Sequence, residues 1–513
     1  MERTLQDVIS HIKGCTVTGD PKNKIITDLT IDSRTAGKGS LFICLVGVHT
    51  DGHAYIEKAA SLGAEAVLVE KDVPPVPGLV MIRVKSTQET MTELAPWFYD
   101  YPAQKMRMIG ITGTNGKTTT TNILRTLLTN TGHKVGLIGT INIMIGDEVE
   151  ASHNTTPDVV DLQRTLCRMA DAGCDYVVME VSSHALALNR VAGIEYDTAA
   201  LTNITQDHLD FHKTMENYRE AKALLFTHLH EGRKKGKTAI FNMDDASSPL
   251  IMNRVKTKVM TYGKARTNDV YPIRFHVGAK HMELSLHTPE GNMDLRLHIT
   301  GEFNVYNVMT AVCAALAEGL KHDDIVRGLD NFAGVPGRFQ LIDAGQPFTV
   351  IVDYAHTPDG LDNVLRTARQ ITKGRLWAVF GCGGDRDAKK RPIMGKLALE
   401  LADILVVTSD NPRSEDPDTI IRDIETGFSD NPQHKEIYTI SDRREAIQFA
   451  ISHARPEDVI MTAGKVMRTT RSSRTGPFIL MMGKLFATSS GRETEHDQNR
   501  SHKKSNAGKD ASS

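Results

Sequence analysis

The sequence has little of several features that would mark other classes of protein. Its 513 residues include only six cysteines, and no two of them form a Cys-x-x-Cys pair. Cysteines scattered in this way exclude a disulfide framework and fit a reducing compartment. The formal net charge is −2, from 61 basic and 63 acidic residues. Without an excess of positive charge, nucleic acid is not an expected partner, and small anionic ligands are.

Long apolar runs are also lacking. No segment is long enough to cross a bilayer, and the residues from Met1 to Asp7 contain no apolar signal region. We therefore expect a cytoplasmic protein without a membrane partner, acting as a monomer. The chain is too long for one ordinary hydrophobic core, so several domains are expected.

The most informative stretch runs from Met108 to Thr120. An apolar strand breaks there into the turn Gly113–Gly116, followed by Lys117, Thr118 and a helical pattern. Such a turn directs backbone N–H groups and the positive end of the helix dipole toward phosphates. Lys117 adds a charge, and the Thr118 hydroxyl can ligate Mg²⁺. The general phosphate-loop pattern requires glycine where this chain has Ile111, so a Gly-rich turn without a ligand is the alternative. We predict an ATP site.

The segment before this loop has its own α/β pattern. Two buried strands and a helix between them are predicted at Leu41–Val46, Ala66–Val69 and Ala54–Leu62. Ser33 lies in a turn, and the polar loop Gly47–His53 follows a strand end, where ligands of α/β sheets bind. The alternative is an ordinary capping serine and a solvated loop. A linker is expected from Pro96 to Pro102.

Polar residues after the loop are candidates for metal and nucleotide contacts. Glu180 ends a buried strand, where a carboxylate commonly holds the metal, although it could be a buried residue satisfied by its own hydrogen bonds. Gln206–His212 contains two His and two Asp, which could form a metal cluster or a solvated loop. Lys222, on an amphipathic helix, is by itself typical of a lysine that extends to solvent. Asn304 and Asn307 share a helix face and could reach a base or ribose.

The last third of the chain again alternates strands with helices. Buried strands are predicted at Phe348–Asp353, Leu376–Gly381, Ile404–Thr408 and Val459–Thr462. Polar loops follow the first three, which is typical of a doubly wound parallel sheet with its site at one edge. Arg386 and Arg413 in these loops suit bidentate recognition of a carboxylate.

Taken in order, five motifs resemble the Mur ligase family over residues 1–465. They are Thr-Gly-Thr-Asn-Gly-Lys-Thr, Glu-Val-Ser-Ser-His, the Lys222 helix, Val-Asp-Tyr-Ala-His-Thr-Pro and Asp-Asn-Pro-Arg. The resemblance implies three α/β domains. These are a UDP-sugar domain at 1–103, a P-loop ATPase domain with a parallel-rich sheet at 104–333, and a Rossmann-like amino-acid domain at 334–488. It also implies an ATP- and Mg²⁺-dependent ligase of peptidoglycan precursor synthesis, which forms an amide through an acyl phosphate.

The resemblance assigns roles to individual residues. ATP would be held by Gly113, Thr114, Asn115, Gly116, Lys117, Thr118, Thr119, Asn304, Arg338 and Asp353. Thr118, Glu180, His208 and a carbamylated Lys222 would bind magnesium; Lys117, Glu180, His208 and Lys222 would be catalytic. The UDP-sugar-peptide substrate would contact Ser33, Val48, His49, Thr50, Asn154, Thr155, Thr156, Ser182, Leu188 and Arg190. Leu188 stands where the family often has Gln.

The motif Asp410-Asn411-Pro412-Arg413 resembles the family members that add meso-diaminopimelate to UDP-N-acetylmuramoyl-L-alanyl-D-glutamate. Diaminopimelate is lysine with an extra carboxylate, and Arg413 can pair with that group. A site built to pair a charge rejects an analogue that lacks it. Arg386 and Gly464 complete the implied amino-acid site.

The resemblance ends after Lys465. The family continues with Gly-His-Glu-Asp-Tyr-Gln, whereas this chain has an unrelated segment over 466–488 and a polar tail over 489–513 that should be disordered. Codons can be chosen for the residues after Lys465 so that reading from the last base of the Lys465 codon gives GHEDYQIIKDGTIHFDDG, which contains the family's Gly-His-Glu-Asp-Tyr-Gln. We therefore hypothesise a one-base deletion, and a genuinely divergent tail is the alternative. Because Arg468 stands where the family has a Glu that accepts the substrate's amino group, ligation should be impaired.

Two other functions are compatible with a phosphate loop. A folylpolyglutamate synthetase uses ATP in the same way, but the domain before the loop and the Asp-Asn-Pro-Arg motif argue against this function. A nucleotide-binding relative without catalysis is suggested only by the altered tail.

Overall fold

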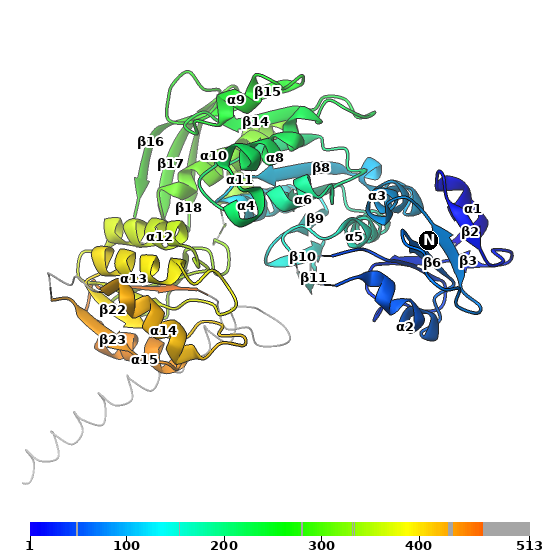
Figure 1. Ribbon diagram of the computed structural model, residues 1–513. Coiled ribbons are helices and arrows are strands. Elements are labelled where there is room, and N and C mark those ends of the chain that lie inside the picture. Colours follow the sequence, from blue (N-terminus) through cyan, green and yellow to red (C-terminus); the bar gives the residue numbers. More distant parts are fainter. Residues whose placement is uncertain are drawn as a thin grey trace, which may run out of the picture. The chain divides into compact units, whose positions relative to one another are not determined.

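Strands and helices alternate throughout the chain, and the computed structural model describes residues 1–47, 50–152, 154–278, 281–330, 332, 334–428 and 434–464 (Figure 1). They divide into two compact units. The first comprises Met1–Arg274, Leu284–Leu295 and Val305–Asp330; the second comprises Phe275–Glu283, Arg296–Asn304 and the described residues beyond 331.

The N-terminal domain, drawn in blue, is built on a five-stranded sheet of order β2-β7-β6-β5-β4, in which only β2 is antiparallel to its neighbour. Alternate residues of β5 face opposite sides: Leu41 and Ile43 join one apolar cluster and Phe42 joins the other. The elements are β1 (Arg3–Thr4), α1 (Leu5–His11), β2 (Thr16–Thr18), β3 (Ile25–Ile26), β4 (Asp28–Thr30), β5 (Ser40–Ile43), η1 (Gly52–Tyr55), α2 (Ile56–Ser61), β6 (Ala66–Val69), β7 (Val80–Arg83), α3 (Thr87–Phe98) and η2 (Pro102–Lys105).

The predicted linker at Pro96–Pro102 is wrong at its start. Pro96 lies inside α3 and is buried, and the helix continues to Phe98. Leu94, Ala95 and Phe98 of this helix are buried in the apolar cluster of the domain. We infer that this burial outweighs the cost of one proline close to the helix end.

The central domain contains an eight-stranded sheet of order β11-β10-β9-β12-β8-β13-β14-β15. The six strands from β9 to β15 in this order are parallel, and β10 and β11 form an antiparallel edge. Its elements are β8 (Arg107–Thr112), α4 (Lys117–Asn130), β9 (Val135–Ile138), β10 (Asn142–Ile145), β11 (Glu148–Ala151), α5 (Val159–Asp171), β12 (Tyr176–Glu180), α6 (Ser183–Ala187), β13 (Thr198–Leu201), α7 (Leu209–His212), α8 (Met215–Thr227), β14 (Thr238–Asn242), α9 (Ser248–Met252) and β15 (Lys258–Tyr262).

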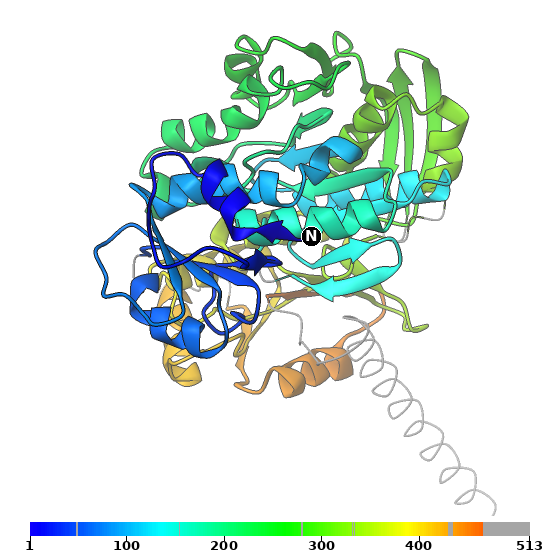
Figure 2. The same ribbon diagram turned by 90° about the vertical axis from the view of Figure 1, so that its right-hand side faces the viewer.

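The order of these strands places the phosphate loop at the middle of the sheet. From β8 the chain passes to β9 and then β12 on one side, and later to β13 on the other. The carboxyl end of β8 is therefore a topological switch point, where open α/β sheets bind ligands. A separate sheet of order β16-β17-β18 follows, with β16 (Tyr271–Val277), β17 (Met282–Thr288), β18 (Gly291–Leu297), α10 (Phe303–Ala317) and α11 (His322–Leu329) (Figure 2).

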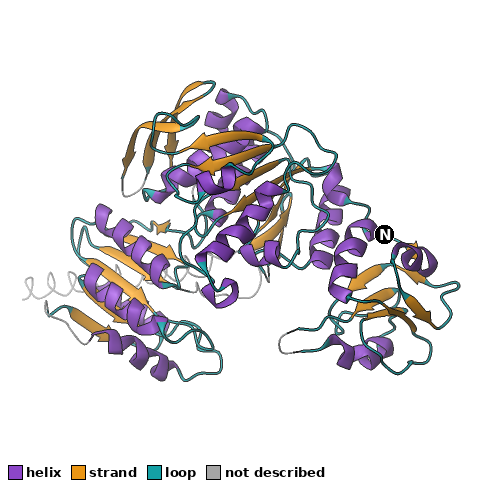
Figure 3. Ribbon diagram, turned by 45° about the horizontal axis from the view of Figure 1, so that its top comes forward, coloured by secondary structure: helices purple, strands orange, loops and turns teal. Residues whose placement is uncertain are grey.

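The C-terminal domain has a six-stranded sheet of order β19-β20-β24-β21-β22-β23, parallel except for β19. Its two faces bury separate clusters, one with α12, α13 and α14 and the other with α15; Figure 3 distinguishes its strands and helices. The elements are β19 (Gln340–Ile342), β20 (Thr349–Asp353), α12 (Pro358–Ile371), β21 (Leu376–Phe380), α13 (Lys390–Leu401), β22 (Ile404–Val407), α14 (Pro417–Glu425), η3 (Thr426–Phe428), β23 (Glu436–Thr439), α15 (Arg443–His453) and β24 (Val459–Ala463).

The predicted fold class is confirmed: parallel-rich α/β domains include a central domain with a phosphate loop and a doubly wound C-terminal domain. None of the helices within the described ranges combines the length and apolar character that crossing a bilayer requires.

Candidate functional site

The loop after β8 is held by the residues that follow β13. The Thr114 amide donates a hydrogen bond of 2.8 Å to the Asn203 carbonyl oxygen. The Asn115 amide donates to the Asn203 side-chain oxygen over 2.9 Å, and the Thr202 hydroxyl donates to the Asn115 carbonyl oxygen over 2.6 Å. These contacts fix the loop between two adjacent strand ends.

Two glycines of the loop adopt conformations that side chains disfavour. Gly113 has φ +148° and Gly116 has φ +88°. A Cβ at Gly113 would overlap the Thr202 hydroxyl, and one at Gly116 would overlap the Asn307 side chain. Gly116 caps α4, so Lys117, Thr118 and Thr119 form the first turn of the helix, where backbone N–H groups lack partners within the helix. Ile111 is buried inside β8, which explains why no glycine is needed there.

Glu180 joins this loop to a second polar segment. The Thr118 hydroxyl donates to one carboxylate oxygen of Glu180 over 3.0 Å, and the Thr140 hydroxyl donates to the same oxygen over 3.0 Å. The Thr140 amide donates to the other oxygen over 2.8 Å, and its hydroxyl lies 3.0 Å from that of Thr155. Glu180 is buried and well supplied with hydrogen bonds. A continuous polar chain therefore runs from the phosphate loop to Thr155.

Lys222 is buried, which contradicts the interpretation as a lysine extending to solvent. It is 1% exposed, its amine donates to the Gly113 carbonyl oxygen over 2.8 Å, and the amine lies 4.6 Å from the ring centre of Tyr218. Burial, and then the charge of Lys117, lowers the pKa of Lys222 well below its ordinary value. The Tyr218 hydroxyl lies 3.0 Å from the Thr114 hydroxyl. A neutral, nucleophilic amine is therefore favoured beside the phosphate loop.

His208 belongs to a group of aromatic rings beside Tyr218. Its ring centre lies 4.7 Å from that of His184 and 6.4 Å from that of Tyr218. Burial, followed by the neighbouring histidines, lowers the pKa of His184 to about 4. Among the residues that the structure describes, no three His, Cys, Asp or Glu gather to hold a metal ion. The metal-cluster interpretation of Gln206–His212 is therefore unsupported.

The predicted contacts of the UDP-sugar-peptide substrate lie in two places within the first unit. The Thr156 hydroxyl donates to the Glu180 carbonyl oxygen and accepts from the Ser182 amide, at 2.8 and 3.0 Å. The remaining predicted contacts form two groups. In the central domain, Asn154 and Thr155 directly precede Thr156, and Leu188, which is exposed, and Arg190, whose guanidinium lies 2.9 Å from Asp158, follow α6. In the N-terminal domain, Ser33 is buried and Thr50 is exposed. Val48 and His49 lie outside the described residues.

Three of the predicted nucleotide contacts belong to the second unit. Asp353 is buried at the end of β20 and accepts from the amides of Phe339 and Ala355, each over 2.7 Å. Burial raises its pKa. The Arg338 guanidinium stacks over Tyr354, and Asn304 donates to the Thr300 carbonyl oxygen over 2.7 Å.

The predicted amino-acid contacts meet at the carboxyl edge of the second unit's parallel sheet. The Gly384 amide donates to the Asn411 carbonyl oxygen over 2.9 Å, and the Arg413 guanidinium donates to the Gly384 carbonyl oxygen. The loops that contain Arg386 and the Asp410–Arg413 motif are therefore paired, although Arg386 and Arg413 themselves are exposed. Gly464 follows β24 with φ +116°, and a Cβ on it would lie 3.2 Å from an Asp410 carboxylate oxygen. Pro412 lies between the paired residues. Lys465 and all later residues, including Arg468 and the predicted disordered tail, lie outside the described residues.

Thr140 and Tyr218 were missed as site residues by sequence reasoning. Thr140 follows β9 as other polar residues follow their strands, so its place at a strand end could have indicated it. Tyr218 lies four residues before Lys222 on α8, a spacing that places both on one helix face.

The site combines a parallel sheet, a glycine loop at its central strand, a helix that begins at the loop, and the buried Glu180 and Lys222 beside it. These features define the class of α/β proteins that bind nucleotide phosphates. Comparisons with known proteins then specify the family. The sequence patterns of three domains match: "Mur ligase family, catalytic domain" at 25–99, "Mur ligase middle domain" at 111–315 and "Mur ligase, glutamate ligase domain" at 337–466.

Relatives over nearly the whole chain agree with these matches. Proteins named UDP-N-acetylmuramoyl-L-alanyl-D-glutamate--2,6-diaminopimelate ligase are 44% identical in Bacillus velezensis, over 90% of this chain and 93% of that protein, and 46% identical in Bacillus cereus, over 86% and 90%. A solved structure with the same name is 31% identical, covers 91% of this chain and 94% of its own, and has a TM-score of 0.63. The chain belongs to the Mur ligase family.

A folylpolyglutamate synthase structure from Mycobacterium tuberculosis is more distant. It is 20% identical over 73% of this chain, with a TM-score of 0.60, and shows a likeness of fold alone. The alternative that this chain is such a synthetase has no further support.

Proposed function

We propose that the protein is an ATP-dependent ligase that adds meso-diaminopimelate to UDP-N-acetylmuramoyl-L-alanyl-D-glutamate in the cytoplasm, as a monomer. The observation that carries this proposal is the polar chain Thr118–Glu180–Thr140–Thr155, which connects the phosphate loop with the segment predicted to contact the peptide end of the substrate. Relatives at 44–46% identity bear the name of this activity.

The residues of the loop suit a nucleotide triphosphate and Mg²⁺. Thr118 and Glu180 offer a hydroxyl and a carboxylate oxygen 3.0 Å apart at a helix N-terminus, and Mg²⁺ prefers such oxygen ligands. Bound there, the ion would neutralise phosphate charge. His208 is proposed as a further ligand. Asn304, Arg338 and Asp353 are proposed to contact the remainder of ATP.

The buried amine of Lys222 is proposed to react with carbon dioxide. A neutral amine attacks the carbon of CO₂, a C–N bond forms as one C=O π bond breaks toward oxygen, and one N–H proton is released, which leaves a carbamate. The lowered pKa of Lys222 supports this step because only the unprotonated amine is nucleophilic. The resulting carboxylate would supply oxygen ligands for a second Mg²⁺.

The ligation proceeds in two steps. A substrate carboxylate oxygen attacks the γ-phosphorus of ATP, the bond to the bridging oxygen breaks, and ADP leaves. The Lys117 charge and the N–H groups of the α4 N-terminus stabilise the phosphate charge. The neutral amine of diaminopimelate then attacks the acyl carbon. Phosphate leaves, an amide forms and a proton is released. Arg413 and Arg386 are proposed to pair with carboxylates of diaminopimelate, with Asp410, Asn411 and Gly464 around it.

The experiment is a substrate-dependence test on the full chain. Purified protein with ATP and Mg²⁺ receives UDP-N-acetylmuramoyl-L-alanyl-D-glutamate, meso-diaminopimelate, both, or both with lysine in place of diaminopimelate. Phosphate release and a new amide product only with both natural substrates support the proposal. Nucleotide binding without turnover under any combination supports the non-catalytic alternative.

A further inference from the structure

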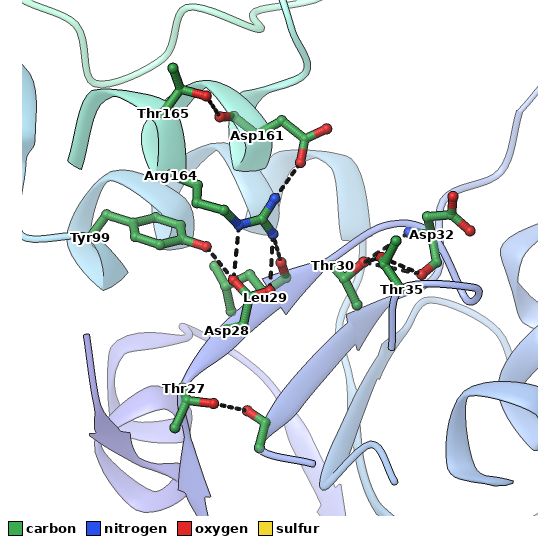
Figure 4. A network of polar contacts seen from close by, with 11 residues as sticks. Thr27, Asp28, Leu29, Thr30, Asp32, Thr35, Tyr99, Asp161, Arg164 and Thr165 are labelled. Atoms are coloured by element: carbon green, nitrogen blue, oxygen red, sulfur yellow. Dashed lines mark hydrogen bonds and ion pairs between the residues drawn. The ribbon is translucent and has the colours of Figure 1, made fainter. Parts of the chain in front are cut away.

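Arg164 connects the central domain to the N-terminal domain. Its Nε and Nη2 atoms lie 3.0 and 3.2 Å from the two carboxylate oxygens of Asp28, and Nη2 also donates to the Leu29 carbonyl oxygen over 2.5 Å (Figure 4). Arg164 lies on α5 and Asp28 on β4. A guanidinium that pairs with both oxygens of one carboxylate fixes orientation as well as distance.

Two more side chains complete this contact, which we call the Arg164 clasp (Arg164, Asp28, Tyr99 and Asp161). The Tyr99 hydroxyl donates to Asp28 over 2.7 Å, and Asp161 accepts from Arg164 over 2.6 Å (Figure 4). Tyr99 is 4% exposed. Val159 and Val160, at the start of α5, belong to the apolar cluster of the N-terminal domain. The helix that carries Arg164 therefore also makes an apolar contact with that domain.

The clasp joins two elements, β4 and α5, that lie next along the chain to the two groups of proposed substrate contacts. Strand β4 leads directly from Asp28 into the turn that carries the buried Ser33. Thr30 holds this turn: its hydroxyl accepts from the Asp32 amide over 3.1 Å and lies 2.7 Å from the Thr35 hydroxyl. On the other side, α5 begins at Val159, three residues after Thr156.

We propose that the Arg164 clasp sets the separation between the subsite for the uridine end of the substrate and the subsite for its peptide end. Arg164 and Asp28 are thus positioning residues. The inference rests on the proposed function, in which one elongated ligand contacts both groups. When the two subsites are held at the separation of the two ends of the ligand, binding of one end places the other at a high effective concentration at its own subsite. A loose domain contact loses that advantage without weakening either contact by itself.

The test compares a fragment with the whole ligand. Dissociation constants of UDP and of UDP-N-acetylmuramoyl-L-alanyl-D-glutamate are measured by calorimetry for the wild type, Arg164→Gln and Asp28→Asn. We expect UDP affinity to change by less than about 2-fold, and affinity for the whole ligand to fall by about 10-fold or more. Arg164→Lys keeps the charge but not the paired geometry, so its affinity for the whole ligand should lie between those of the wild type and Arg164→Gln. It replaces Arg164→Gln in the test if that variant fails to fold.

Arg168→Gln is the matched control. Arg168 lies on the same helix, and its ion pair, of 2.5 Å, is with Glu150 inside the central domain. It should leave both affinities unchanged. Equal weakening of UDP and the whole ligand by Arg164→Gln, or no change in either, would overturn the inference. If the wild type binds UDP but gains nothing from the muramoyl-dipeptide portion, the proposed function fails instead.

Discussion

Lys222 and Lys117 donate hydrogen bonds to the same acceptor, the carbonyl oxygen of Gly113, each over 2.8 Å. Two amines that share one acceptor repel each other when both are charged. Only Lys222 is fully buried, so it is the amine for which the protonated form is disfavoured. The arrangement disfavours the charged form of Lys222 beside Lys117 at the phosphate loop.

This arrangement predicts a stability difference that depends on pH. Because the folded chain lowers the pKa of Lys222, the unfolded chain binds an extra proton between that lowered pKa and the ordinary value of 10.5. Folding stability should therefore rise with pH across this interval. In buffer free of carbon dioxide, the midpoint of thermal unfolding of the wild type relative to Lys222→Met should rise as the pH is raised toward 10.5. Lys258→Met, at an exposed lysine, is the control; a flat difference for Lys222→Met would contradict the prediction.

Gly116 predicts a specific loss of nucleotide binding. Gly116→Ala introduces a Cβ against Asn307 and forces a side chain into φ +88°, so the loop must shift. Strain of this kind costs about 1–3 kcal/mol, which corresponds to a nucleotide affinity at least about 5-fold weaker. Gly132→Ala is the control, because Gly132 has φ +93° just beyond the other end of α4 but open space around it. Isothermal titration with ATP should detect weakening in the first variant only, and equal affinities would refute the role of the loop contact.

Arg413 predicts the choice of amino acid. Arg413→Ala should weaken diaminopimelate binding by about 10-fold or more, because a carboxylate loses its partner, while lysine binding changes little. Binding to protein loaded with ADP and the UDP-linked substrate, a mixture that cannot form the acyl phosphate, gives the two constants. Arg422→Ala, at an exposed arginine on α14, should alter neither. A parallel loss of both ligands in Arg413→Ala would show that the loop, not the charge, had been lost.

The altered tail predicts a low rate of ligation. Replacing residues after Lys465 with GHEDYQIIKDGTIHFDDG restores a Glu where this chain has Arg468, and removes a cation that would repel the ammonium of diaminopimelate. The amide-forming rate should rise by about 10-fold or more, with ATP affinity unchanged. Reading the underlying DNA tests the cause, since codons incompatible with the second frame would exclude a deletion.

The strands were the most predictable part of this fold. Runs such as Tyr176–Val181 and Leu376–Gly381 are apolar on both faces because their strands are buried on both faces, and β12 and β21 lie there. The turn around Gly113 and Gly116 could be predicted because few sites other than a phosphate site require a strand, a glycine turn and a Lys-Thr pair at the start of a helix. The domain boundaries at 103 and 333 remain predictions.

Contacts between distant residues could not be read in the same way. The burial of Lys222 depends on Gly113, 109 residues away, and the hydroxyls of Thr114 and Tyr218 are separated by 104 residues. Helix α8 alone carries no sign of either partner, which is why an amphipathic pattern suggested an exposed lysine. Pro96 misled for a similar reason, since its packing inside α3 depends on the whole N-terminal core.

Strand β24 is the last strand to be synthesised among those described, yet it lies between β20 and β21 in the sheet. The C-terminal sheet therefore cannot close while the ribosome is still adding residues 459–463. A truncation or frame change upstream of these residues removes or replaces an inner strand of the sheet. A frame change at Lys465 falls after that strand, so every strand that the structure describes in this sheet keeps its own residues.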